Sequence, residues 1–112
     1  MNVFIVGAGP GDPELITVKG QKLLSEADVI IYAGSLVNPA LLDYAKAGCE
    51  IHNSASMTLP QVINVIEDSV KQGKMVVRLH TGDPSIYGAI QEQMDALDKL
   101  GIEYKVVPGV SS

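Results

Sequence analysis

Two Gly-Asp-Pro triplets are the part of this 112-residue chain whose residue types and spacing could do chemistry. The first lies in residues 7–13, directly after the apolar residues 3–6, and the second lies in residues 81–88, after the largely apolar run 75–79. Glycine allows a backbone to approach a ligand closely, and aspartate followed by proline suits the start of a helix. Open α/β sheets bind small molecules at such turns, where parallel strands end. The two turns therefore predict a small-molecule site, with a plain tight turn at 7–13 and a simple helix cap at Asp83 as the alternatives.

The first turn also limits the kind of ligand. Its sequence, Gly-Ala-Gly-Pro-Gly-Asp, differs from the dinucleotide-binding pattern because Asp12 stands where that pattern has its third glycine. Pro10 has no N–H to donate to a pyrophosphate, and the Asp12 carboxylate would repel phosphate. A carboxylate such as that of Asp83 would instead favour a cationic sulfonium or amine. We therefore expect a cofactor without phosphate groups.

Other reactive residue types do not form a recognisable site. His52 and His80 are expected at strand ends, and without a cluster of further His or Cys residues they predict no metal centre. Three serines are expected in loops, but none lies in the Gly-x-Ser-x-Gly pattern of a nucleophile elbow: Ser35, Ser54 and Ser56. The sequence therefore names no catalytic residue.

The elements that must position the turns alternate between strand and helix. Strands are predicted at residues 3–6, 29–32, 49–52, 75–79 and 103–107. Helices are predicted after Thr17, from Asn38 to Gly48, from Thr58 to Gly73, and in the segment that ends at Gly101. This alternation indicates an α/β fold in which a five-stranded parallel sheet has helices on both faces. All strands then end at one edge, which collects residues 7–13, 33–37, 53–57, 81–85 and 108–112.

Each predicted helix has an apolar side that is expected to face the sheet. In chain order these residues are Val18, Leu23, Leu24 and Ala27; Leu41, Leu42 and Ala45; Leu59, Val62, Ile63, Ile66 and Val70; and Ile86, Ile90, Met94, Leu97 and Leu100.

Composition excludes several classes of protein. With 46% hydrophobic and 19% charged residues, the chain can form one domain with a real core. A net charge of −5 argues against broad nucleic-acid or anionic-membrane binding, and no apolar run reaches the roughly 18 residues of a membrane span. No signal peptide is visible, and a lone cysteine, Cys49, suits a reducing compartment, so we expect a cytoplasmic protein.

Three motifs in order resemble the tetrapyrrole methylase family across the whole chain. The first is Val6 to Pro13 with Leu15 and Thr17, the second is Gly82-Asp83-Pro84 with Ile86 and Gly88, and the third is residues 107–112, Val-Pro-Gly-Val-Ser-Ser. The resemblance implies S-adenosyl-L-methionine as the cofactor and a tetrapyrrole as the small-molecule substrate. It also implies a strand order of 3-2-4-1-5. The family's cofactor contacts fall on Pro10, Thr81, Gly82, Asp83, Ile86, Ser111 and Ser112.

The resemblance further implies that residues 1–112 are the N-terminal, cofactor-binding half of a two-domain enzyme whose C-terminal domain is absent. Residues 32–37 and 80–88 are most similar to the branch of the family that methylates precorrin-4 or cobalt-precorrin-4 at C11 in cobalamin biosynthesis. Ala33 departs from the uroporphyrinogen methylases, which usually have aspartate there. The alternatives are a methylase of another precorrin position and a non-catalytic binding or assembly module. We expect a homodimer and no methyl transfer by this chain alone.

Overall fold

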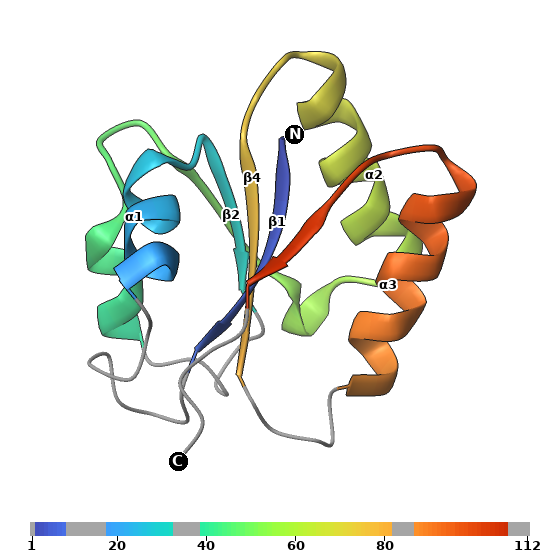
Figure 1. Cartoon of the computed structure of the whole chain (residues 1–112), viewed down its shortest axis with the longest axis horizontal. Helices are drawn as coiled ribbons and strands as arrows, with labels where there is room; N and C mark the ends of the chain where they lie inside the picture. Colours follow the sequence, from blue (N-terminus) through green and yellow to red (C-terminus); the bar gives the residue numbers. More distant parts are fainter. Residues whose placement is uncertain (1, 9–17, 33–38, 82–86, 108–112) are drawn as a thin grey trace.

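The computed structural model describes residues 2–8, 18–32, 39–81 and 87–107. Within these ranges the strands form one parallel sheet in the order β3-β2-β4-β1-β5 (Figure 1). The strands are β1 (Val3–Ala8), β2 (Val29–Tyr32), β3 (Glu50–Asn53), β4 (Val76–Thr81) and β5 (Lys105–Val107). The predicted fold class and strand order are both confirmed.

The central strands β1 and β4 form the middle of the sheet because their apolar runs can be buried on both sides. They pair in parallel from Val3 opposite Val76 to Ala8 opposite Thr81. Val76, Val77 and Leu79 have no exposed surface. Near-continuous apolar strands of this kind are typical of parallel sheets covered on both faces.

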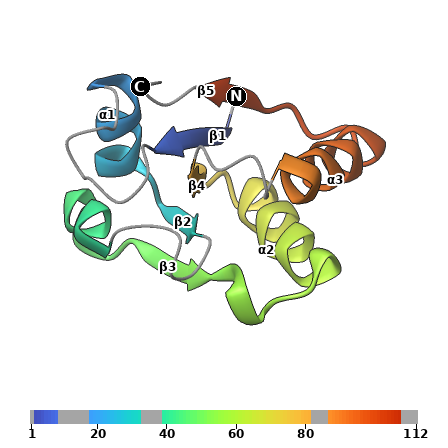
Figure 2. The same ribbon diagram turned by 90° about the horizontal axis from the view of Figure 1, so that it is seen from below.

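Helices cover both faces of this sheet (Figure 2). The 3-10 helix η3 (Pro39–Tyr44) and α1 (Val18–Glu26) lie on one face, and α2 (Leu59–Lys71) and α3 (Tyr87–Lys99) lie on the other. The buried cluster under α1 consists of Val6, Leu23, Leu24, Ala27, Ile30, Val77, Leu79 and Val107. The buried cluster under α2 and α3 consists of Val3, Val29, Ile31, Val62, Ile63, Ile66, Val76 and Leu97.

The boundaries of α2 follow the local signals in the sequence. The Thr58 hydroxyl accepts a hydrogen bond from the Gln61 N–H, and the Gln61 side chain accepts one from the Thr58 N–H, which together form a capping box. After the helix, Gly73 has a φ of 75°, a left-handed conformation that glycine adopts without strain. Both ends of the predicted helix are therefore confirmed.

The helical segment after β2 differs from its prediction. The predicted helix reaches Gly48, but the structure has the 3-10 helix η3, which ends at Tyr44. The N–H of Ala45 bonds to the carbonyl of Leu42, and that of Cys49 to the carbonyl of Lys46, so the chain continues in tight three-residue turns. Such geometry is common in short connecting segments.

Two expected core positions are also wrong. Val18, in the first turn of α1, is 83% exposed because the sheet-facing side of α1 is formed by Gly20, Leu23 and Leu24. Leu100 is 48% exposed because α3 ends at Lys99, so Leu100 lies outside the helix and its side chain is not held against the sheet. The strand boundaries otherwise move by one or two residues, as helix and strand ends commonly do.

Candidate cofactor site

The centre of the sheet contains a topological switch point between β1 and β4. The chain leaves β1 toward α1 on one face, and it leaves the adjacent β4 toward α3 on the opposite face (Figure 2). In open α/β sheets, ligands bind beyond the carboxyl ends of the strands at such a point, because the two connections diverge there. The topology therefore places the candidate site next to Ala8 and Thr81, which are register partners at the ends of these strands.

Most residues of the predicted site lie outside the described residues. These are Pro10, Gly82, Asp83, Ile86, Ser111 and Ser112. Thr81 is described as the last residue of β4, and Val107, the last residue of β5, is the register partner of Val6 in β1. The structure thus brings together the three strand ends from which the predicted motifs begin, since β5, β1 and β4 are neighbours.

Beneath this edge, β4 contains a buried cation that the sequence analysis missed. Arg78 is the chain's only arginine, and only 5% of it is exposed. Its Nε donates to Oε1 of Gln93 in α3 at 2.9 Å, and its Nη1 donates to the carbonyls of Ile31 at 3.2 Å and Leu79 at 3.3 Å. Burial lowers the pKa of the guanidinium to about 10, so it is still charged at neutral pH.

A usable signal for this cluster was present in the sequence. Arg78 interrupts an otherwise apolar strand, and Gln93 falls on the apolar side of α3 four residues before Leu97. Gln93 is 5% exposed, which is unusual for a glutamine without a buried partner. Two polar residues on inward-facing positions of adjacent elements therefore indicate a buried pair, because each needs a hydrogen-bond partner away from water.

The end of β2 is held by a second side chain. The Oγ of Ser54, at the start of the 3-10 helix η4 (Ser54–Ser56), donates to the carbonyl of Tyr32 at 3.0 Å. Tyr32 is the last residue of β2, and its ring packs partly buried against the apolar cluster under α1. Ser54 therefore has a structural contact in place of the nucleophilic role that its sequence context already excluded.

Histidines in the described residues do not assemble a metal centre. His52 lies 2.9 Å from Glu50 in the same strand, β3, and this contact holds the pKa of the Glu50 carboxyl below its usual value. His80 is buried in β4 opposite Gly7. Among residues 2–8, 18–32, 39–81 and 87–107, no three His, Cys, Asp or Glu side chains are grouped so that they could hold a metal ion.

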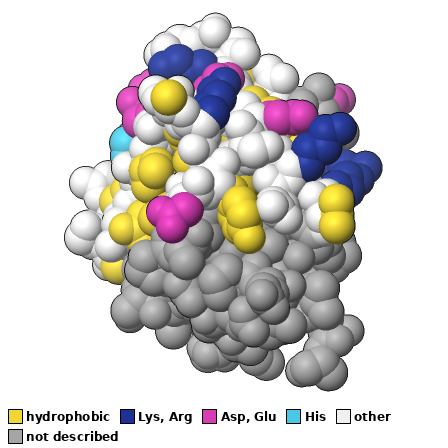
Figure 3. Space-filling view, turned by 90° about the vertical axis from the view of Figure 1, so that its left-hand side faces the viewer, with side chains coloured by type: hydrophobic (Ala, Val, Ile, Leu, Met, Phe, Trp, Pro, Cys, Tyr) yellow, Lys and Arg dark blue, Asp and Glu magenta, His cyan; other side chains and the backbone are white. Residues whose placement is uncertain are grey.

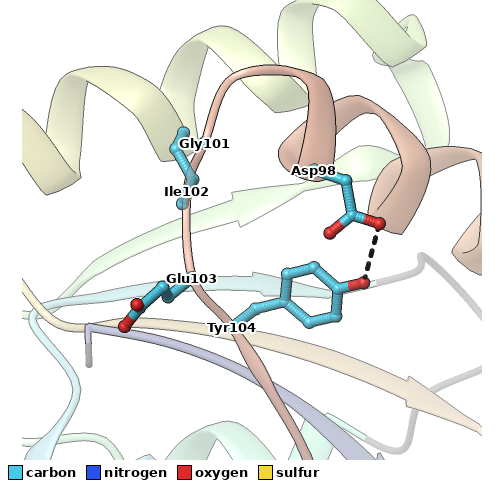
Figure 4. A pocket seen from close by; sticks show the side chains of 5 residues that line it. All are labelled: Asp98, Gly101, Ile102, Glu103 and Tyr104. Atoms are coloured by element: carbon cyan, nitrogen blue, oxygen red, sulfur yellow. Dashed lines mark hydrogen bonds between the residues drawn. The ribbon is translucent and has the colours of Figure 1, made fainter.

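A surface depression of about 550 Å³ lies at the opposite end of the sheet, where α3 turns into β5 (Figure 4). The Tyr104 hydroxyl points toward α3 and donates to the Asp98 carboxylate at 3.4 Å, while Glu103 points away from it. Partial burial, with the nearby Asp98 charge, raises the pKa of Tyr104. The depression lies at the amino end of β5, whereas the switch point lies at the carboxyl ends of β1 and β4. The two are therefore separated by the length of the strands.

The face that carries α1 and η3 has no strongly charged region among its described residues. Lysine side chains and acidic side chains are interspersed there with apolar ones (Figure 3). A nucleic-acid surface would need a concentration of basic groups. None of the helices in the described ranges is both long and apolar enough to cross a membrane.

Arg78 does not face a ligand at this edge, because it is only 5% exposed. The guanidinium of Arg78 is the natural partner for a phosphate, but its Nε and Nη1 are engaged by a side-chain amide and two main-chain carbonyls beneath the edge. What the described part of the edge offers is the main chain of neighbouring strand ends at Ala8 and Thr81.

Comparison with known proteins points to one family. Residues 2–112 match the family described as Tetrapyrrole (Corrin/Porphyrin) Methylases. The chain is 67% identical over 110 residues to the cobalt-precorrin-4 C(11)-methyltransferase of Methanocaldococcus jannaschii, an alignment that covers 98% of this chain and 42% of that protein. It is 51% identical over 112 residues to the precorrin-4 C(11)-methyltransferase of Pseudomonas aeruginosa, covering 100% of this chain and 44% of that protein.

Solved structures agree with the sequence comparison. The X-ray structure of the cobalt precorrin-4 methyltransferase CbiF matches with a TM-score of 0.90 and 52% identity, over 97% of this chain and 46% of that one. A uroporphyrin-III C-methyltransferase from Thermus thermophilus, complexed with S-adenyl homocysteine, matches with a TM-score of 0.78 and 36% identity, over 99% of this chain and 46% of that one. The chain therefore spans less than half the length of these relatives.

Proposed function

Because this chain belongs to the tetrapyrrole methylase family, we propose that it is the cofactor-binding half of an S-adenosylmethionine-dependent methyltransferase that acts on precorrin-4 or cobalt-precorrin-4 at C11. The observation that carries the proposal is the 67% identity to a cobalt-precorrin-4 C(11)-methyltransferase over nearly the whole chain. The switch point between β1 and β4 supports it, since both Gly-Asp-Pro turns follow these two strands.

The residues proposed to hold the cofactor come from the segments after β1, β4 and β5. They are Pro10, Thr81, Gly82, Asp83, Ile86, Ser111 and Ser112. In this assignment the Asp83 carboxylate faces a positively charged part of the ligand, and the glycines allow close approach of the main chain. The register of β1, β4 and β5 supports a shared site, because their ends are adjacent.

The proposed chemistry requires positioning more than it requires a reactive side chain. S-adenosylmethionine, when bound, would supply an already activated methyl group for transfer to an electron-rich ring carbon of the substrate. The contribution of this chain is to orient the methyl group and to exclude water, and these effects can supply a large part of a rate enhancement. This agrees with a sequence that offers neither a nucleophile elbow nor a metal centre.

The relatives are more than twice as long as the aligned segment, so we propose that the substrate lies between this domain and a second one. We further propose a cytoplasmic homodimer, in which a partner chain covers apolar surface beside the strand ends. Sedimentation of the 112-residue chain tests the dimer, and a monomer at all concentrations would contradict it.

The deciding experiment compares this chain with a two-domain form, in which it is joined to the part of the Methanocaldococcus jannaschii relative outside the aligned 110 residues. We expect the two-domain form to bind S-adenosylmethionine in a calorimeter and to methylate precorrin-4 or its cobalt complex, and the 112-residue chain to show no turnover. A non-catalytic module would bind no cofactor in either form. Activity of the short chain equal to that of the two-domain form would show that the second domain is not needed.

Within the two-domain form, Asp83→Ala should raise the Kd for S-adenosylmethionine about tenfold, the usual effect of losing a hydrogen bond to a charged group. Asp68→Ala is the matched control, because Asp68 is exposed on α2. Equal Kd values for the two variants would remove Asp83 from the site.

A further inference from the structure

Arg78 has no part in the chemistry proposed above, yet its burial needs an explanation. Its register partners in the neighbouring strands are Ile5 and Ile31, both of which are almost completely buried. The described partners of the guanidinium are a neutral amide and carbonyl groups. Removing a charge from water without a countercharge is costly, and well-packed apolar replacements of buried polar groups are often neutral or stabilising. Stability alone therefore does not account for an arginine at this position.

The hydrogen bonds of Arg78 connect three elements that lead to the candidate site. One carbonyl belongs to Ile31, one residue before β2 ends at Tyr32, and the other to Leu79, two residues before β4 ends at Thr81. The side-chain partner is Gln93, in the second turn of α3. A planar guanidinium has donors in fixed directions, so these bonds also fix how the three elements sit relative to one another.

These three elements border two of the segments that follow the strands. Residues 82–86 join the end of β4, which contains Arg78, to the start of α3, which contains its partner Gln93. Residues 33–38 follow β2, where Arg78 bonds to the carbonyl of Ile31 and Ser54 bonds to that of Tyr32. The carboxyl ends of β2 and β4 and the second turn of α3 are therefore tied to one side chain, that of Arg78.

We infer that Arg78, together with Gln93, is a positioning pair that holds the carboxyl ends of β2 and β4 and the second turn of α3 in the arrangement that binds the cofactor. This inference rests on the proposed function for the identity of the ligand. Arg78 acts through the main chain and α3 rather than by touching the cofactor. Its loss should therefore weaken binding even where the fold is as stable as before.

The test separates positioning from stability with a double variant, Arg78→Met/Gln93→Leu, in the two-domain form. Replacing both polar partners by apolar groups of similar size leaves neither side chain unpaired, so the thermal midpoint should stay within a few degrees of the parent. The Kd for S-adenosylmethionine should nevertheless rise about tenfold or more. Arg78→Lys keeps the charge but loses the planar guanidinium with its fixed donor directions, and it should also weaken binding.

Val62→Ala is the matched control, because Val62 is buried on the same face of the sheet but its side chain has no group that could hydrogen-bond to the positioning pair. It should lower the thermal midpoint and leave the Kd within about twofold of the parent. In the 112-residue chain, amide exchange at residues 31–32, 79–81 and 87–93 should be faster in the double variant than in the parent, and unchanged in the control.

The outcomes distinguish this inference from the proposed function. The positioning role would be overturned if the double variant kept the parent's Kd. It would also be overturned if the Kd changed in step with the thermal midpoint to the same degree in the double variant and in Val62→Ala, or if amide exchange rose evenly over the sheet. If the unsubstituted two-domain form does not bind S-adenosylmethionine, the proposed function fails first and this inference fails with it. If the double variant does not fold, Arg78→Lys decides the question by the same comparison.

Discussion

The two faces of the sheet differ in what they bury. Under α1 the described cluster is formed by apolar side chains alone, whereas the face under α2 and α3 also buries Ser69, Arg78, His80 and Gln93. Arg78 and His80 lie on this second face because they are two and four residues after Val76, which belongs to the cluster there, and every second residue of a strand faces the same side. The same strand therefore contributes aliphatic residues to one face and polar ones to the other.

The position of the polar groups explains the difference. Arg78 and His80 follow Val76 toward the carboxyl end of β4, so the polar side chains that this strand contributes lie nearest the switch point. Ser69, near the end of α2, instead donates to the carbonyl of Val65 within its own helix. Toward the amino end the same face is aliphatic, with Val3, Val29 and Val76 side by side. The comparison teaches that β4 becomes polar toward the end that supports the candidate site and is aliphatic where it begins.

The largest expected effect tests the apolar face. Leu24→Ala should destabilise the protein by about 3 kcal/mol, because Leu24 is completely buried under α1 and its loss leaves a cavity. Leu100→Ala removes the same atoms from a half-exposed position and should cost no more than about 0.5 kcal/mol. Urea unfolding measures both. Similar losses for the two variants would mean that the cluster under α1 is not a packed core.

A smaller loss is expected on the polar face. Gln93→Leu should cost about 2 kcal/mol, because it leaves Arg78 buried without its side-chain acceptor. Gln91→Leu is the control on the same helix, since Gln91 is exposed and donates to Asp95 at the surface; it should change stability by less than about 0.5 kcal/mol. If Gln93→Leu stabilised the protein, the polar face would not need its hydrogen bonds.

The start of α2 should respond to a change that touches neither cluster. Thr58→Ala removes the hydroxyl that accepts from the Gln61 N–H and should cost about 1 kcal/mol. Ser56→Ala, in the exposed η4 turn just before the helix, should have almost no effect. Thermal unfolding of both variants compares them, and an equal response would show that tertiary packing alone fixes where α2 begins.

The smallest effect concerns a polar contact at the amino edge of the sheet. Lys46 Nζ lies 2.6 Å from Asp28, and the Met75 N–H donates to the same carboxylate at 2.9 Å; these contacts hold the pKa of Asp28 below its usual value. Because the folded pKa is the lower one, the contribution of Asp28 to stability is present above about pH 4 and is lost as the pH falls through the folded value.

Urea unfolding at pH 6 and pH 3 measures this contribution. Asp28→Asn should lose less stability than the parent between these two pH values, and Asp68→Asn, at an exposed site on α2, should behave as the parent does. An unchanged pH dependence in Asp28→Asn would show that the contact with Lys46 is too exposed to matter.

Much of the fold could be predicted because its signals are local or repeat at short intervals. The apolar runs of β1, β2 and β4 indicate buried parallel strands whatever their neighbours are. Thr58 and Gly73 mark the ends of α2 by hydrogen bonds and a backbone conformation that depend on adjacent residues only. The strand order, by contrast, was implied by the resemblance to the family and then confirmed by the pairing.

The sequence by itself thus determined the fold class, the edge on which the two Gly-Asp-Pro turns follow their strands, and the family. Only the tertiary structure decided which side chains share the interior. Val18 fits an apolar helix pattern but lies in water. Arg78 and Gln93 stand out as polar residues at apolar positions, but only the structure shows that they bond to each other, fifteen positions apart along the chain. Burial depends on which elements meet across the sheet, and neither composition nor helix period contains that information.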